Sequence, residues 1–154
     1  MQINDVVTAI AIKLHETFGD SYTIYTDSIE QGFKEPAFFI ALLEPNLKQV
    51  IGNRYHKTIP LDIHYFGTGN MDAHITADKL MCDMEYIQCL NGDLLRGTKM
   101  SANLVDNVMH FFVNYNMHIY REKEAIPMME ELTIQGREKE MMLDGRTKAN
   151  SKNY

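Results

Sequence analysis

The chain has 154 residues, 45% of them hydrophobic and 23% charged, a composition typical of one folded domain and not of a disordered or membrane-spanning chain. No apolar run approaches the roughly 20 residues that cross a bilayer, and the start MQINDVV lacks the basic and apolar stretches of a secretory signal. The net charge of −6 argues against a general affinity for nucleic-acid phosphates, and two cysteines are too few for a disulfide scaffold. We therefore expect a soluble protein of a reducing cytoplasm.

The amino-terminal third predicts one helix and two strands. Apolar residues recur on one face over residues 4–18, with Asn4 placed to cap the start and Gly19 to close the end. Aromatic and β-branched residues predict a short strand over 22–26. Residues 37–43 are apolar at both parities, which is typical of a central strand covered on both faces.

The next segment alternates between apolar and polar residues and predicts a strand over 54–66, with Ile59, Leu61, Ile63 and Tyr65 on one face. Residues 47–52 before it fit a loose turn or the tip of a hairpin. Pro60 cannot donate a hydrogen bond to a neighbouring strand, so it marks an edge position, a bulge, or the point where the strand changes partner.

A second helix is predicted over residues 71–90, because small and apolar residues recur there at steps of three and four. This apolar stripe consists of Ala73, Ala77, Leu80, Met84 and Ile87, and Asn91-Gly92 supplies the stop signal. Cys82 and Cys89 would both lie on this helix as residues flanking the core, too far apart along its axis for a disulfide.

A long β-hairpin is predicted from residue 94 to about residue 121. Asp106-Asn107 suits a two-residue turn with both residues at positive φ. The strand that leaves this turn would extend about 43 Å at about 3.3 Å per residue, far beyond an ordinary strand. We expect part of this hairpin to overhang the domain and to be covered by a second subunit.

Beyond the hairpin we expect a linker over 122–127, a short strand over 131–135 and a charged tail. Residues 137–154 hold five basic and three acidic residues, a net of +2, which leaves −8 on residues 1–136. The predicted organisation is one α/β domain of the α+β type over 1–136, with a mostly antiparallel sheet backed by two helices in the order α-β-β-β-α-β-β-β. The tail, 137–154, is either disordered or ordered on assembly.

No constellation of residues indicates catalysis or metal binding. The histidines form no HxH or HxxxH pair, and His110 and His118, eight residues apart on one strand face, lie about 26 Å apart at about 3.3 Å per residue, too far to share one ion. A third phosphate-loop glycine, a GxSxG elbow and an HExxH pair are all missing. We expect no catalytic residue, no cofactor-binding residue and no metal site.

Several blocks of the chain, in order, resemble a family of phage tail terminator proteins found in prophages and phage-like particles of low-GC Gram-positive bacteria. The blocks are INDVV (3–7), YTIY (22–25), QGFKEPAFFI (31–40), LKQVIGNRY (47–55), DIHYF (62–66), LLRGTKM (94–100) and HFFVNYNM (110–117). The resemblance covers roughly residues 1–135, and no block is a catalytic signature.

This resemblance implies a small α/β protein that assembles as a ring, usually a hexamer, on the head-proximal end of the tail tube. There it stops tube polymerisation and presents a surface for joining to the head. It implies no enzymatic activity and no cofactor. The implied partners are copies of the chain itself, the tail tube protein and, as further candidates, sheath and neck proteins, with no nucleic acid and no membrane. The implied location is the host cytoplasm during assembly and then the virion.

Closing a ring requires that an element protruding from one subunit contacts a different patch on the next. The hairpin 94–121 and the segment 44–56 are the elements expected to protrude. Their polar and basic residues are our candidates for the subunit or tube interface: Lys48, Gln49, Asn53, Arg54, Arg96 and Lys99. Two alternatives stay open, another neck or head-completion adaptor, and a small enzyme or ligand-binding domain in which His64, His110 and His118 line one pocket.

Overall fold

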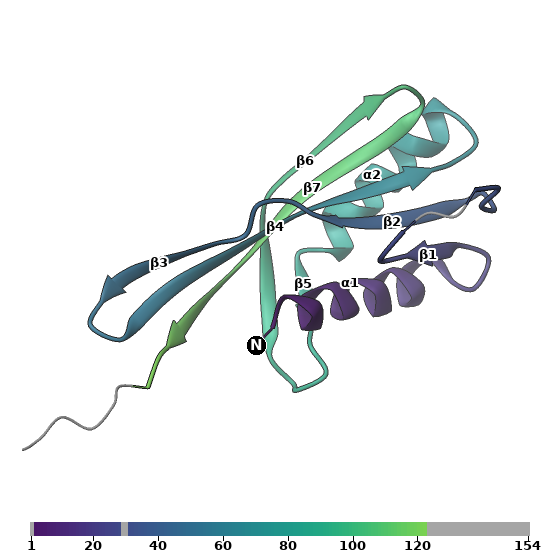
Figure 1. Cartoon of the computed structure of the whole chain (residues 1–154). Helices are drawn as coiled ribbons and strands as arrows, with labels where there is room; N and C mark the ends of the chain where they lie inside the picture. The colour runs from purple at the N-terminus through teal and green to yellow at the C-terminus, as the bar shows by residue number, and fades with distance from the viewer. Residues whose placement is uncertain (1, 29–30, 123–154) are drawn as a thin grey trace, which may run out of the picture. The chain divides into compact units, whose positions relative to one another are not determined.

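The computed structural model describes residues 2–28 and 31–122, in which residues up to Arg121 form one compact unit (Figure 1). Two helices and seven strands occur in these residues. In chain order they are α1 (Ile3–Phe18), β1 (Thr23–Tyr25), β2 (Ala37–Leu42), β3 (Asn46–Ile51), β4 (Arg54–Phe66), α2 (Asn70–Asp83), β5 (Tyr86–Gln88), β6 (Leu94–Val105) and β7 (Val108–Tyr120). The predicted strand over 131–135 and the tail lie outside the described residues, so the predicted domain boundary at 136 stays a prediction.

The sheet has the strand order β1-β2-β4-β7-β6-β5, and β3 pairs with the beginning of β4 outside this order. The predicted α+β class with two helices is confirmed. The sheet is mixed, because β1 runs parallel to β2 while the other ladders are antiparallel. One strand more than predicted separates the two helices, because residues 46–51 form β3 and pair with residues 54–58 in a hairpin.

Both helices pack on one face of the sheet and bury its apolar side chains there (Figure 1). The alternation in β4 is confirmed, since Ile59, Leu61, Ile63 and Tyr65 are all buried. The buried residues of β7, which lies beside β4, extend the same core: Met109, Phe111, Val113 and Tyr115. At typical values each fully buried large apolar side chain contributes about 1.5–3 kcal/mol, so this layer dominates the stability of the domain.

The helix predicted over 4–18 is confirmed, but its cap differs from the prediction. The N-cap is Gln2 and not Asn4, because the Asp5 carboxylate accepts a hydrogen bond from the Gln2 backbone N–H at 2.8 Å. This contact satisfies a backbone donor at the helix start and places a negative charge where the helix dipole favours it. Gly19 closes the helix at φ 89°, as expected of a glycine at that position.

The prediction that β2 is covered on both faces is only half right. Phe38 and Ile40 are buried beneath the helices. On the opposite face Ala37 is also buried, whereas Phe39 and Ala41 are partly exposed. Among the described residues no helix covers that second face (Figure 1). The apolar run therefore reflects one buried face and one aromatic face that is only partly shielded.

Pro60 marks the point where β4 changes partner, one of the three roles predicted for it. On one side β4 pairs with β7 without interruption from Arg54 to Tyr65. On its other side, residues 54–58 pair with β3 and residues 61–66 pair with β2. The Pro60 carbonyl still accepts a hydrogen bond from the Leu43 N–H at 3.0 Å. Proline has no backbone N–H, and at this position none is needed, because it lies between the segment that pairs with β3 and the segment that pairs with β2.

The second helix is shorter than predicted, because it ends at Asp83 and residues 86–88 form β5. Met84 and Ile87 are buried as the helical stripe predicted, but a strand pairing holds them there. Cys89 is consequently not on the helix; it is buried beyond β5, while Cys82 is exposed. Pairing with β6, which comes later in the chain, overrides the local helical pattern.

β6 changes partner at Gly97. Residues 97–105 pair with β7, whereas residues 94–96 turn away and pair with β5. A Cβ atom on Gly97 would lie 2.6 Å from the carbonyl oxygen of Met84, so only glycine allows this close approach of two backbones. As a result, residues 116–120 of β7 have no strand partner on the side that β6 leaves, within the described part of the chain.

The hairpin turn is confirmed, with Asp106 at φ 51° and Asn107 at φ 65°. β7 is 13 residues long, as predicted. Its overhanging part is the end remote from this turn, where β7 runs beside the beginning of β4 and away from both helices (Figure 1).

Candidate functional site

A three-stranded arm extends from the helix-covered body of the domain (Figure 1). It consists of β3, residues 54–58 of β4 and residues 116–120 of β7, with the Gly52-Asn53 turn at its tip. We call residues 46–58 and 116–121 the arm. None of these residues is buried, although β4 and β7 have buried residues as soon as they enter the body. The arm therefore gains almost nothing from the core and presents both of its faces to the surroundings.

The arm is cationic on an acidic chain. It carries Lys48, Arg54, Lys57 and Arg121 and no aspartate or glutamate. The rest of the unit, residues 2–28, 31–45 and 59–115, has thirteen acidic and five basic residues, a net of −8. The two parts of one subunit thus have opposite charge, which favours contact between the arm of one copy and the body of another.

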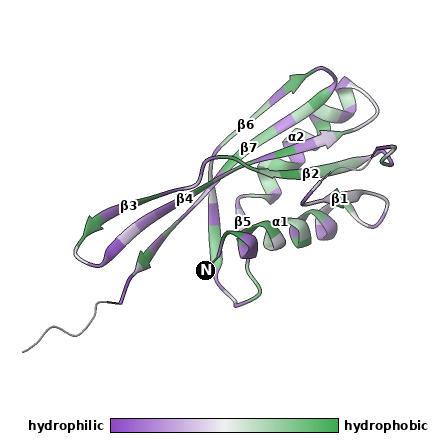
Figure 2. Cartoon of the chain, viewed as in Figure 1, coloured by the Kyte–Doolittle hydropathy of each residue, from purple (hydrophilic) through white to green (hydrophobic). Residues whose placement is uncertain are grey.

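The two faces of the arm differ in character. On the face that continues the core side of the sheet, Leu47, Tyr55, Met117 and Ile119 lie on adjacent strands. The Arg121 guanidinium carbon lies 4.3 Å from the centroid of the Tyr55 ring, a cation–π contact that covers part of this face. Figure 2 shows the hydrophobic end of β3 beside the hydrophilic start of β4.

The opposite face of the arm carries a row of nitrogen-bearing side chains. Lys48, His56 and His118 are cross-strand neighbours, and the two imidazole rings lie 5.1 Å apart. Arg54 lies beside Tyr120 on the same face, and its Nε atom has no hydrogen-bond partner in the described part of the chain.

The structure divides the six predicted interface residues into two groups. Lys48, Gln49, Asn53 and Arg54 belong to the arm, where Gln49 Nε2 donates to the Gly52 carbonyl at 2.7 Å and braces the tip. Arg96 and Lys99 lie on β6, outside the arm. Arg96 forms an ion pair with Glu85 at 3.3 Å, and Lys99, at φ 52°, lies within the register shift of β6. An interface role for these two residues stays a prediction.

The apolar residues of the arm were not among the interface residues predicted from the sequence. Val50 is 50% exposed, Ile51 72% and Tyr120 67%, which is unusual for large apolar side chains gathered at one end of a domain. Val50 and Ile51 lie in the segment 47–52, for which the sequence predicted a loose turn or the tip of a hairpin. Their exposure depends on where the helices stop covering the sheet, a non-local property.

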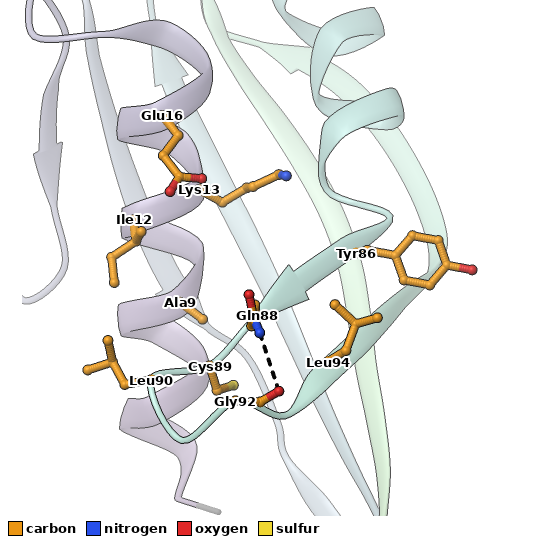
Figure 3. A pocket seen from close by; sticks show the side chains of 10 residues that line it. All are labelled: Ala9, Ile12, Lys13, Glu16, Tyr86, Gln88, Cys89, Leu90, Gly92 and Leu94. Atoms are coloured by element: carbon orange, nitrogen blue, oxygen red, sulfur yellow. Dashed lines mark hydrogen bonds between the residues drawn. The ribbon is translucent and has the colours of Figure 1, made fainter.

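A shallow groove of about 530 Å³ with a mixed polar and apolar lining lies between α1 and the β5–β6 turn (Figure 3). Ile12, Tyr86, Leu90 and Leu94 line it and are themselves substantially exposed, Leu90 at 81%. Its charged lining residues, Lys13 and Glu16, come from successive turns of α1. A groove lined by exposed aliphatic side chains fits contact with a protein surface better than the orientation of a small substrate.

Cys89 also lines this groove, but it is not an activated nucleophile. Burial is the largest cause that raises the pKa of its thiol, followed by the charges of Asp5 and Asp93. A thiol with a raised pKa stays protonated near neutral pH, and only the thiolate attacks efficiently. The groove therefore supplies no nucleophilic cysteine.

Four of the six histidines form two separate cross-strand pairs and do not line one pocket. His64 lies opposite His110, with ring centroids 4.4 Å apart, and Asp62 bridges them. His56 lies opposite His118, on the arm. The alternative in which His64, His110 and His118 line one pocket is therefore not the arrangement observed. As the sequence predicted, His110 and His118 do not belong to one site. The pairing of His64 with His110 was not predicted, because it depends on the register of β4 against β7.

A family model described as phage tail terminator protein matches residues 5–127. No curated protein matches the chain. The match covers α1 from Asp5 onward, α2 and all seven strands of the described fold, including the whole arm. The chain belongs to the phage tail terminator family, and the family resemblance seen in the sequence is thereby confirmed.

Membership of this family makes the protein a structural component of a phage tail or neck that interacts with other virion proteins. Among the described residues, no helix has both the length and the hydrophobicity needed to cross a membrane.

Proposed function

We propose that this protein closes the head-proximal end of a phage tail by forming a ring, six copies as the family resemblance implies, on the last layer of tube subunits. The ring stops tube growth and presents the surface to which the head joins. The protein performs this task by contact alone, without catalysis or a cofactor, first in the host cytoplasm and then in the virion.

The observation that carries this proposal is the opposition of charge within one subunit. The arm extends away from the body of its own subunit and so does not contact that body. Its four cations, with no acidic residue among them, can instead contact the acidic body of the next copy. Such a contact joins two different surfaces and repeats from copy to copy, so it closes into a ring when the rotation between copies permits. We assign Lys48, Gln49, Asn53 and Arg54 to this contact.

The groove between α1 and the β5–β6 turn is suited to receive an apolar element. Its exposed Leu90 and Leu94 are matched in character by Val50 and Ile51 at the tip of the arm. An interface core of this kind, surrounded by charged residues, is the usual anatomy of a specific protein contact. The tube and neck proteins would then contact the two flat sides of the ring.

The mass of the particle in solution tests the proposal directly. We expect the purified chain to form a ring by itself or once tube subunits are added, seen by light scattering or native mass spectrometry. Phage particles that lack the protein should carry tails of abnormal length in electron micrographs. A species that stays a 17.8 kDa monomer with and without tube protein, together with tails of normal length, would overturn the proposal.

The same micrographs distinguish the neck-adaptor alternative. Loss of a head-completion adaptor leaves tails of normal length that fail to attach, whereas loss of a terminator changes tail length itself. Labelled protein located at the tail end of headless tails would support the terminator assignment.

A further inference from the structure

Two histidines and an aspartate converge on the sheet face that no described helix covers. Asp62 and His64 come from β4, and His110 lies directly opposite His64 on β7. The Oδ2 atom of Asp62 lies 3.0 Å from Nε2 of His64 and 2.9 Å from Nδ1 of His110. The ligand atoms of the three side chains all lie within 4.8 Å of one another. From this geometry we infer that Asp62, His64 and His110 form a binding site for a divalent transition-metal ion such as Zn²⁺.

The spacing of these atoms fits the coordination shell of such an ion. Zinc binds nitrogen and oxygen ligands at about 2.0–2.1 Å, which places neighbouring ligands roughly 3 Å apart. The separations from Asp62 Oδ2 therefore match the edges of a coordination polyhedron. Two imidazoles and one carboxylate on one side of the ion leave a further position for water.

The carboxylate of Asp62 is under-satisfied by the protein. Its side chain is only 9% exposed, and its Oδ1 atom has no hydrogen-bond partner in the described part of the chain. Both histidine contacts converge on the other oxygen, Oδ2. Burying a carboxylate with one oxygen unpartnered is costly, and a cation that contacts this carboxylate compensates the cost.

The surroundings hold the ligands while leaving a path for the ion. The His64 ring packs edge-on against Phe39, with centroids 5.4 Å apart, and His110 stacks beside Phe112 at 6.2 Å. These aromatic rings restrict the rotation of the imidazoles and lower the local polarity, which strengthens a metal–ligand bond. Each histidine side chain remains 23% exposed, so the ion can enter from solvent.

The donor set also selects among cations. Imidazole ligands favour zinc, copper, nickel and cobalt, whereas magnesium and calcium prefer shells made entirely of oxygen. We expect Mg²⁺ at the same concentration to leave the site unoccupied.

The arm provides a matched control inside the same two strands. His56 and His118 face each other across β4 and β7 as His64 and His110 do, with rings 5.1 Å apart, but Lys48 is their neighbour on β3. A pair without a carboxylate and beside an ammonium group lacks the charge that a metal ion requires.

Calorimetric titration of the full-length chain, purified without a histidine tag, with ZnCl₂ tests the inference. We expect one Zn²⁺ per chain and a rise in the thermal midpoint. Asp62→Asn and His64→Gln should each weaken binding by more than the about 10–100-fold that loss of an outer-shell partner costs. His56→Gln should leave binding unchanged. With Co²⁺ as the probe, the visible ligand-field absorption should disappear in the same two variants.

Binding of equal strength in the wild type, Asp62→Asn and His64→Gln would overturn the inference, as would the absence of saturable binding or a loss confined to His56→Gln. Circular dichroism without metal verifies that each variant is folded. If Asp62→Asn is unfolded, His64→Gln and His110→Gln, whose side chains are partly exposed, decide the question.

Discussion

One strand of this protein serves two different purposes along its length. In residues 59–65 of β4 every second side chain is buried beneath the helices, whereas residues 54–58 have no buried side chain. Both halves pair with β7 in one continuous register. The ladder of backbone hydrogen bonds is therefore equally complete in both, and only the cover differs. Folding therefore constrains the residues of the body half. The residues of the arm half are not needed for the core and can be selected for contact with other proteins.

Truncating an apolar side chain should separate the two halves most strongly. Leu61→Ala removes a fully buried side chain and should lower the free energy of unfolding by about 2–5 kcal/mol. Leu47→Ala removes a side chain that is 43% exposed and should change it by no more than about 0.5 kcal/mol. Urea denaturation followed by circular dichroism measures both. Equal losses would mean that the arm packs against something in the free subunit.

Charge reversal on the arm should disrupt assembly and leave folding intact. The double variant Lys48→Glu/Arg54→Glu replaces attraction to an acidic surface with repulsion, so we expect association of copies to weaken at least about tenfold, equivalent to about 1.4 kcal/mol. Sedimentation or light scattering at several salt concentrations measures it.

The control for this experiment is Arg96→Glu/Lys99→Glu, which changes the net charge by the same amount on β6. We expect assembly of this variant to stay close to wild type. If the β6 variant is the more damaging one, the contact surface lies on the body and not on the arm.

Alkaline pH should act on the body through its buried tyrosines. Burial raises the pKa of both Tyr65 and Tyr115 above the usual value near 10, and the hydrogen bond to Asp72 raises that of Tyr65 further. The folded state thus holds protons that the unfolded state releases above about pH 10, so stability is full below that pH and falls above it. The slope should approach about 1.4 kcal/mol per pH unit for each tyrosine.

Tyr115→Phe should lower the slope of the free energy of unfolding against pH by the contribution of one tyrosine. The substitution also removes the hydrogen bond that the Tyr115 hydroxyl donates to the Met84 carbonyl at 2.7 Å. Denaturation curves between pH 8 and pH 11 test this expectation. An unchanged slope in Tyr115→Phe would show that other groups set the alkaline limit.

The smallest effect is expected at the turn between β6 and β7. Asn107 adopts φ 65°, a conformation that glycine reaches without strain. Asn107→Gly should therefore stabilise the protein by roughly half a kcal/mol, because Asp-Gly is a preferred pair in this turn type. Thermal denaturation measures the shift, and Asn107→Ala, which should destabilise, is the matched comparison.

Elements defined by local pattern were predictable from the sequence. The alternation of β4 fixed its bounds and its buried face, and Asp106-Asn107 fixed the position of the hairpin turn. In both cases the signal lies within a few adjacent residues. α1 was predictable for the same reason, although its cap was not, because Asp5 performs a capping role from inside the helix.

Features that depend on pairing between distant segments were not predictable. β5 has a helical apolar pattern and becomes a strand only because β6 offers an edge at Arg96 and Leu95. The cluster of Asp62, His64 and His110 requires the register of β4 against β7. The interface candidates were chosen from the sequence because they are polar or basic. The sequence does not show that Lys48, Gln49, Asn53 and Arg54 lie on the arm while Arg96 and Lys99 lie on β6; this distinction requires the fold.

Because β6 leaves β7 at Gly97, the edge of β7 over residues 116–120 has no strand partner among residues 2–28 and 31–122. The outer edge of β3, on the other side of the arm, has none among these residues either. An unpaired strand edge can pair with a strand of another chain and so cause aggregation. Lysine side chains on the edge strand commonly prevent this. Lys48, on the edge strand β3, occupies that position here. A residue that we assign to the contact between subunits would thus also oppose aggregation of the free protein. The free protein then stays monodisperse until it meets its acidic partner surface.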